Sequence, residues 1–170
     1  GAMQRYVEEQ RRIGRSIGLV PTMGALHDGH LSLLRRCRAD NDVAVMTLFV
    51  NPKQFDRSED LARYPRDLAR DADLAAAAGT DAIYHPAMEE MYPGGYATYV
   101  IVEGLTDRWE GATRPGHFRG VATVCTKLFA VCRPHRAYFG QKDYQQSLVI
   151  RRLVADLNLG FEIVVLPTVR

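Results

Sequence analysis

Several features that mark large classes of proteins are missing from this sequence. No apolar run approaches the ~18–20 residues of a membrane-spanning helix, and the longest such stretch is residues 43–50. Basic and acidic side chains almost balance, at 22 and 20, which gives no support to nucleic acid or a membrane surface as a partner. No internal repeat, low-complexity tract or secretory signal is visible, so we expect one cytoplasmic domain.

Cysteine is also scarce. Cys37, Cys125 and Cys132 are odd in number and form no C-x-x-C pair. We expect three core thiols in a reducing compartment. Residues 1–3 look like a protease-cleavage scar and are set aside, which leaves a domain of residues 4–170.

Apolar runs alternate along the chain with segments of helical periodicity. Most of the runs are continuously apolar, as in strands that are buried on both faces of a parallel sheet. The pattern predicts a doubly wound α/β domain, with ligands at the carboxyl ends of the strands. Strands are predicted at residues 17–20, 43–50, 82–84, 98–102, 137–139 and 162–166, and helices at 4–12, 29–39, 65–78, 119–131 and 143–158. Residues 51–64 and 103–118 lack a pattern and are expected to be functional or mobile loops.

The most informative segment is residues 21–30, PTMGALHDGH, between a predicted strand and a predicted helix. His27 and His30 therefore stand at a helix N-terminus, where free backbone N–H groups and the helix dipole attract anions. Gly24 and Gly29 allow the backbone to approach a ligand closely. Imidazoles in this position suit a polyphosphate, although two such histidines near a turn are also compatible with a plain surface site.

A second segment, residues 140–146 (GQKDYQQ), also connects a predicted strand to a helix. Lys142 would be a mobile cation suited to a phosphate. Asp143 either caps the helix or faces a ligand. Gln146 lies one turn later, so it can face the same cleft as Asp143.

A third segment, residues 49–55 (FVNPKQF), ends the predicted strand 43–50. Asn51 and Gln54 offer amide donors and acceptors to a small polar ligand. The alternative is an ordinary Asn-Pro turn.

Basic side chains in a fourth segment, residues 114–120 (RPGHFRG), suggest either a loop near the site or a surface basic loop. Arg35, Arg36 and Arg38 are expected on the solvated face of a helix, and the Tyr64-Pro65-Arg66 segment is expected to be a turn without chemistry.

Together, these four motifs, in this order over residues 17–170, resemble the pantothenate synthetase (pantoate–β-alanine ligase) family. The resemblance implies a Rossmann-like, doubly wound parallel sheet of the HxGH nucleotidyltransferase superfamily. It implies that the pantoate carboxylate attacks ATP to form pantoyl adenylate and pyrophosphate. The β-alanine amine then displaces AMP to form pantothenate, with Mg²⁺ required, and such enzymes are usually homodimers.

The resemblance also implies roles for individual residues. His30 would have an acid role, His27 would stabilise phosphate charge, and Lys142 would complete the catalytic set. Pantoate and β-alanine would be held by Gln54, Gln146, Thr22 and Asn51, whereas Arg114 and His117 match a nearby loop of less defined role. No metal ligand is assigned. ATP would be held by Met23, Gly24, Ala25, Leu26, His27, Asp28, Gly29, His30, Gly140, Gln141, Lys142, Asp143 and Val169.

Members of this family carry a further C-terminal domain that closes over the site, and we expect that domain to be absent from this chain. We therefore expect little or no turnover by these 170 residues. Two other interpretations are a different nucleotidyltransferase and a module that only binds nucleotide and pantoate. A nucleic-acid-binding role has little support, because no basic stripe is present.

Overall fold

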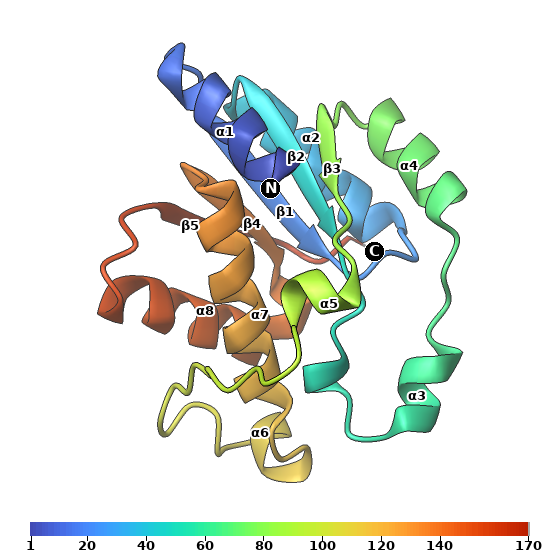
Figure 1. Cartoon of the computed structure of the whole chain (residues 1–170), viewed down its shortest axis with the longest axis vertical. Helices are drawn as coiled ribbons and strands as arrows, with labels where there is room; N and C mark the ends of the chain where they lie inside the picture. Colours follow the sequence, from blue (N-terminus) through green and yellow to red (C-terminus); the bar gives the residue numbers. More distant parts are fainter. Residues whose placement is uncertain (170) are drawn as a thin grey trace.

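The computed structural model describes residues 1–169, and its centre is a sheet of five parallel strands (Figure 1). The strand order is β3-β2-β1-β4-β5. The strands are β1 (Ile17–Thr22), β2 (Val43–Leu48), β3 (Ala82–Tyr84), β4 (Arg136–Gly140) and β5 (Glu162–Leu166). All six residues of β2 are buried, as the continuous apolar run predicts for a strand covered on both faces.

Helices cover both faces of the sheet (Figure 1). One face packs against α1 (Ala2–Arg12), α7 (His117–Cys132) and α8 (Tyr144–Asp156). The other face packs against α2 (Asp28–Asp40) and α4 (Leu68–Ala77). Successive side chains of β1 alternate between the two cores, with Leu19 in the first and Val20 in the second.

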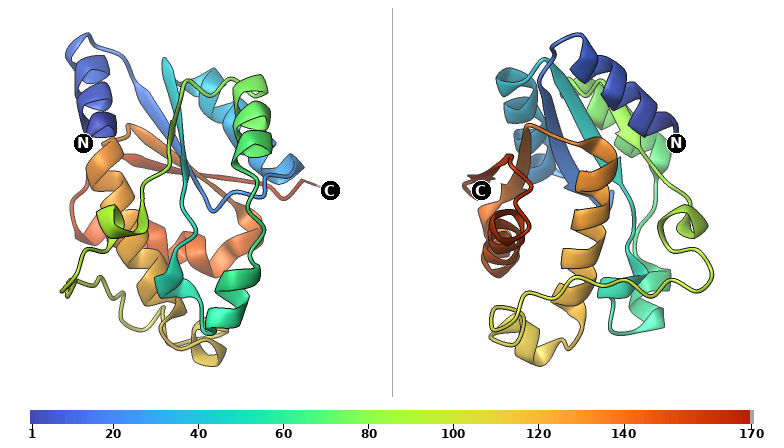
Figure 2. Two further views of the ribbon diagram at one scale, coloured as in Figure 1. Left: turned by 45° about the vertical axis from the view of Figure 1, so that its right-hand side comes forward. Right: turned by 60° about the vertical axis from the view of Figure 1, so that its left-hand side comes forward.

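The two unpatterned segments contain short helices. Residues 51–64 form the 3-10 turn η1 (Pro52–Gln54) and helix α3 (Ser58–Arg63), and residues 103–118 include α6 (Glu110–Thr113). Both α3 and α6 lie beyond the carboxyl ends of β1 and β2 (Figures 1 and 2). The remaining short elements are α5 (Met88–Met91) and η2 (Gln141–Asp143).

One predicted strand is wrong. Residues 98–102 form no strand, and the Val100 N–H donates to Thr123 Oγ1 of α7 at 2.9 Å. The segment is rich in β-branched residues, but it contacts α7 and pairs with none of the strands within residues 1–169. Residues 2 and 3, which look like a cleavage scar in the sequence, form the first turn of α1, and Met3 packs against the core.

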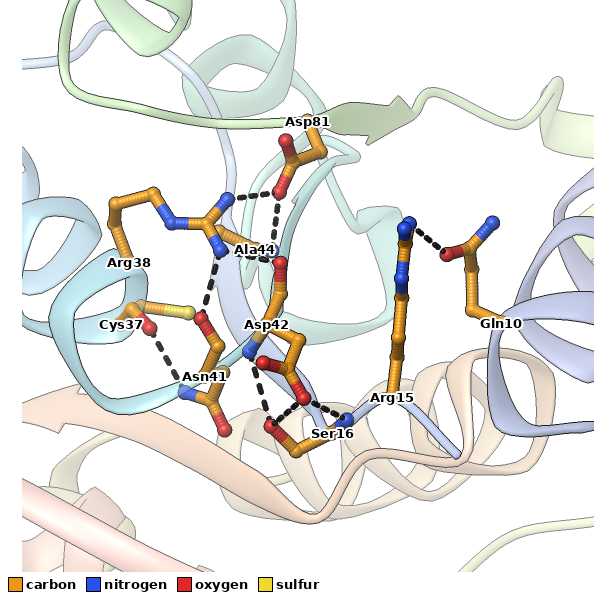
Figure 3. A network of polar contacts seen from close by, with 9 residues as sticks. All are labelled: Gln10, Arg15, Ser16, Cys37, Arg38, Asn41, Asp42, Ala44 and Asp81. Carbon is orange, nitrogen blue, oxygen red and sulfur yellow. Dashed lines mark hydrogen bonds and ion pairs between the residues drawn. The ribbon is translucent and has the colours of Figure 1, made fainter. Parts of the chain in front are cut away.

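A polar network joins the amino ends of three neighbouring strands (Figure 3). Ser16 and Asp42, which precede β1 and β2, bond reciprocally: Ser16 N donates to Asp42 Oδ2 and Asp42 N donates to Ser16 Oγ. Asp81, which precedes β3, accepts from Ala44 N at 2.8 Å and pairs with Arg38. The expectation that Arg38 is only solvated is therefore wrong, whereas Arg35 and Arg36 are exposed.

The three cysteines are free and buried, which confirms that they are core thiols. Burial raises the pKa of Cys125 and of Cys132 to about 12. Across residues 1–169, no helix combines the length and the apolar character needed to cross a membrane.

Helix α7 approaches η1 closely at Gly120. A Cβ at Gly120 would lie 2.3 Å from the carbonyl oxygen of Lys53 and 2.5 Å from its carbonyl carbon. The Gly120 carbonyl also accepts from Asn51 Nδ2 at 3.0 Å. The absence of a side chain at Gly120 therefore sets how α7 and η1 pack.

We predict that Gly120→Ala destabilises the chain, because the new methyl group meets backbone atoms that cannot rotate away. The expected loss is about 1–3 kcal/mol, or roughly 3–10 °C in Tm, measured by thermal unfolding. Gly94→Ala is the matched control, since no atom lies within 4 Å of its Cβ position. Equal melting temperatures for the two variants would contradict the packing argument.

Candidate functional site

Two cavities lie at the carboxyl ends of the strands. The first cavity, of about 270 Å³, lies beside η1 and α7, and the second, of about 200 Å³, lies between α2 and the segment after β5. This is the edge of an α/β sheet at which ligands are expected to bind. The two cavities meet at a shared wall formed by Pro21, His27, His30, Phe139, Asp143 and Gln146.

His27 and His30 sit at the N-terminus of α2, as the sequence predicts. His27 is the N-cap, and its Nδ1 accepts from Gly29 N at 3.0 Å. His30 Nδ1 accepts from His27 N at 3.2 Å, and the two ring centroids are 4.1 Å apart. Because each Nδ1 is an acceptor, each neutral ring carries its proton on Nε2, where it can donate to a ligand.

His30 is held in its neutral form. Burial, followed by the neighbouring charge of His27, lowers the pKa of His30 to about 4, against an opposing effect of Asp71. Protonation at Nδ1 would also end its hydrogen bond from His27 N. His30 therefore offers a neutral N–H donor at physiological pH rather than a cation.

Backbone donors around the histidines are already occupied. Gly24 N donates to Thr22 Oγ1, and the N–H groups of Ala25 and Leu26 donate to Asp71. The sequence predicts free N–H groups at the helix N-terminus, whereas the N–H groups of the loop just before it turn towards side chains of the protein. The imidazoles of the HxGH motif present the remaining donors. Asp71 was missed because no motif marks it and it lies on another helix, α4.

The first cavity brings Gln54 and Gln146 together from η1 and α8. Asn51 lines the cavity too, but its groups bind protein: Nδ2 donates to Gln54 Oε1 at 3.0 Å, and Oδ1 accepts from the Tyr92 hydroxyl at 2.7 Å. Since Gln54 Oε1 is used as an acceptor, its Nε2 is left to donate into the cavity. Asn51 therefore orients Gln54, and Asn51 itself is 1% exposed.

The rest of the first cavity is largely apolar. Its floor comes from α7, and Phe49 and Phe139 close its sides. Tyr64 also lines it, although its segment was expected to have no chemistry. The mixed lining suits a small branched ligand with a few polar groups. The α7 residues of the floor are Val121, Val124, Cys125 and Leu128.

The second cavity contains Lys142. Among residues 1–169, Lys142 is the only cationic side chain lining the first two cavities. Asp143 occupies the N-cap position of α8 but makes no capping hydrogen bond, so it faces the cavities instead. Burial, followed by the charge of Glu110, raises the pKa of Asp143. Gly140 and Val169 line this cavity as well.

Arg114 and His117 line a third cavity, of about 300 Å³, beside the first. Arg114 pairs with Glu110 at 2.9 Å and Asp56 at 3.2 Å. His117 Nδ1 lies 2.8 Å from the carbonyl oxygen of Gln54, which can only accept. Arg114 Nη2 also donates to the Gln54 carbonyl at 3.4 Å, so both residues bear on the position of Gln54.

Gln145 was overlooked beside Gln146. Its Nε2 donates to the carbonyls of Leu105 and Arg108 at 2.8 and 2.6 Å, and its Oε1 accepts from Glu110 N at 3.0 Å. This buried amide anchors the segment that leads into α6.

Not every residue assigned by the resemblance reaches a cavity. Thr22 and Met23 line the first cavity and Gly29 lines the second. Five others line none of the cavities described: Gly24, Ala25, Leu26, Asp28 and Gln141. Within residues 1–169 no group of three His, Cys, Asp or Glu side chains could hold a metal ion.

Residues 1–170 match the family described as Pantoate-beta-alanine ligase. The chain is 65% identical over 169 residues to a pantothenate synthetase from Moorella thermoacetica, and this match covers 99% of the chain and 60% of that protein. The chain therefore spans about 60% of the length of this curated relative.

Solved structures show the same fold. Pantothenate synthetase from Thermus thermophilus is 56% identical with a TM-score of 0.90, over 96% of this chain and 60% of that one. A pantoate-beta-alanine ligase from Francisella tularensis, complexed with beta-gamma ATP and beta-alanine, is 37% identical with a TM-score of 0.92, over 99% and 66%. These matches confirm the Rossmann-like α/β class.

We predict that His30 lowers the free energy of unfolding of the chain as the pH decreases. Its pKa is about 4 in the folded chain and ordinarily 6.5, so the unfolded chain takes up the proton first as pH falls below about 6.5. Between pH 8 and pH 5 the chain should lose more stability than His30→Gln, which keeps an acceptor at this N3 position. After discounting for the partial exposure of His30, the difference is about 1 kcal/mol, or roughly 2–4 °C in Tm.

The comparison with His30→Gln isolates this effect from His135, whose pKa is also lowered and which both proteins retain. Parallel curves of Tm against pH for the two proteins would show that His30 titrates normally.

Proposed function

The chain belongs to the pantoate-beta-alanine ligase family, and on this premise we propose that its site serves the condensation of pantoate with β-alanine to pantothenate, using ATP through a pantoyl-adenylate intermediate. The meeting of the two cavities at His27 and His30 carries the proposal. A carboxylate in one cavity and a nucleotide in the other would face each other there.

The first cavity suits pantoate. Its apolar α7 floor would contact the branched carbon skeleton, and Gln54 and Gln146 would bind the hydroxyl and carboxylate groups. The second cavity would take ATP, with Gly140 and Val169 beside the nucleoside and Lys142 beside the terminal phosphates.

In the first step, a pantoate carboxylate oxygen bonds to the α-phosphorus and the bond to the bridging oxygen breaks, so that pyrophosphate leaves. We assign His27 and His30 to donate from Nε2 to the phosphate oxygens, where negative charge grows. In the second step, the β-alanine amine bonds to the acyl carbon, loses a proton, and AMP leaves.

Mg²⁺ fits this site only as an ion that arrives on the nucleotide, since residues 1–169 form no metal-binding cluster. It would neutralise phosphate charge, and Asp143, in both cavities, is the carboxylate that would contact it. We also propose that this protein functions as a homodimer.

Two alternatives are less well supported. A different nucleotidyltransferase would not need two glutamines in a cavity of mixed polar and apolar lining beside the histidines. A module that only binds is favoured by one observation: Lys142 is the single cation of the first two cavities within residues 1–169, and a triphosphate carries several negative charges. We therefore expect these 170 residues to bind ATP weakly and to turn over slowly or not at all.

We predict that Gln54→Ala and Gln146→Ala weaken pantoate binding about tenfold, because each removes an amide from the proposed pantoate cavity. ATP binding should change much less. Isothermal titration of the chain with pantoate, and separately with Mg²⁺–ATP, measures both. Gln4→Ala, exposed on α1, is the control. Equal losses for both ligands would reject the assignment of the first cavity.

We predict that Lys142→Ala and His30→Ala each slow adenylate formation by about a hundredfold, the scale of removing one transition-state donor. Pantoate-dependent ATP–pyrophosphate exchange measures this step, in the chain extended to the full length of its relatives. Lys127→Ala, on α7 away from the first two cavities, is the control. Exchange that needs no pantoate would favour the other nucleotidyltransferase interpretation instead.

A further inference from the structure

The loop between β1 and α2 contains two consecutive residues with left-handed backbone. Gly24 has φ +80° and Ala25 has φ +53°. For alanine this conformation costs roughly 1–2 kcal/mol, because its Cβ approaches the following carbonyl oxygen. Some interaction must therefore hold the loop in this shape immediately before His27.

The holding interaction comes from a carboxylate far away in the sequence. Asp71 of α4 is 1% exposed, and its two oxygens accept from Ala25 N and Leu26 N, both at 2.9 Å. Each oxygen thus fixes one of two successive peptide groups. Arg70 Nη1 lies 3.4 Å from Asp71 Oδ1, and the Arg70 side chain is half exposed.

The Asp71 carboxylate leaves no room for a side chain at Gly24. A Cβ at Gly24 would lie 2.9 Å from Asp71 Oδ2, closer than real Cβ contacts. The backbone of the loop therefore approaches α4 as closely as a glycine allows. Directly after Leu26, His27 takes its N-cap position and begins the hydrogen bonds that set both imidazole tautomers.

We propose that Asp71 is a positioning residue for the His27–His30 pair. Its two hydrogen bonds from Ala25 N and Leu26 N fix the conformation of the backbone from which both imidazoles present Nε2. That the imidazoles bind a nucleotide rests on the proposed function, whereas the positioning of the backbone by Asp71 does not. Asp71 also acts through space, because its negative charge opposes the lowering of the His30 pKa.

The test compares Asp71→Asn with Asp73→Asn, which makes the same charge change at an exposed position of the same helix. In Asp71→Asn one oxygen acceptor is replaced by an NH₂ group that cannot accept from the loop. Hydrogen exchange of the Ala25 and Leu26 amides should accelerate by at least about tenfold, the equivalent of 1.4 kcal/mol. Asp73→Asn should leave both rates unchanged.

Nitrogen NMR of the imidazoles gives a second readout that loss of stability alone would not move. In the parent chain both rings should show an acceptor Nδ1 and a protonated Nε2. In Asp71→Asn the chemical shifts of the two nitrogens in each ring should move towards a common average, because both tautomers become populated. The pKa of His30 should also fall further, because the nearby negative charge is gone. Unchanged imidazole spectra in a folded Asp71→Asn chain would overturn the proposal.

If Asp71→Asn does not fold, amide hydrogen exchange of the unsubstituted chain tests the proposal instead. Ala25 and Leu26 amides that exchange much more slowly than in an unstructured peptide support the grip, and exchange at the peptide rate overturns it. Titration with Mg²⁺–ATP separates this inference from the proposed function. Loss of binding of about tenfold in Asp71→Asn supports both. A parent chain that binds no nucleotide, with the loop readouts as expected, would refute the function alone.

Discussion

Because β1 hydrogen-bonds to β2 on one side and to β4 on the other, the segments that follow these strands leave the sheet at one edge. Both pairings of this central group are parallel, so the carboxyl ends coincide. The HxGH motif, the Asn51–Gln54 turn and the Lys142 segment meet only for this reason. At the opposite edge, the network around Arg38 and Asp81 joins the amino ends of β1, β2 and β3 and leaves the carboxyl edge to the cavities (Figure 3).

Buried polar side chains outside the recognisable sequence motifs orient the side chains that belong to those motifs. Asp71 grips the loop that leads into the histidines, and Asn51 turns the amide of Gln54. Gln145 anchors the segment before α6, and His117 contacts the Gln54 backbone. Each of these groups has hydrogen-bond partners within the protein, which makes such networks rigid when the surrounding dielectric is low. The functional groups are thereby placed on a pre-organised frame.

The electrostatic character of the site follows from this frame. Backbone N–H groups donate to Nδ1 of both His27 and His30, and burial keeps His30 neutral, so His30 acts through an N–H dipole rather than through a positive charge. Fixed dipoles need no reorganisation when charge develops on a phosphate, which is why they lower a barrier effectively. Lys142 adds one mobile cation at the nucleotide side.

Local pattern was sufficient for much of the fold and for the location of the site. Continuous apolar runs predicted all five strands, and the position of His27 and His30 at a helix N-terminus followed from the strand–helix boundary alone. Local pattern failed at residues 98–102, whose β-branched residues pair with no strand within residues 1–169, and at Arg38, whose partner Asp81 lies far away in the sequence. Tertiary structure alone decided that Asn51 orients Gln54, that Tyr64 lines a cavity and that Asp71 holds the loop. Periodicity and motif spacing report on neighbours along the chain, whereas hydrogen bonds between α4 and the β1–α2 loop exist only after the sheet has brought them together.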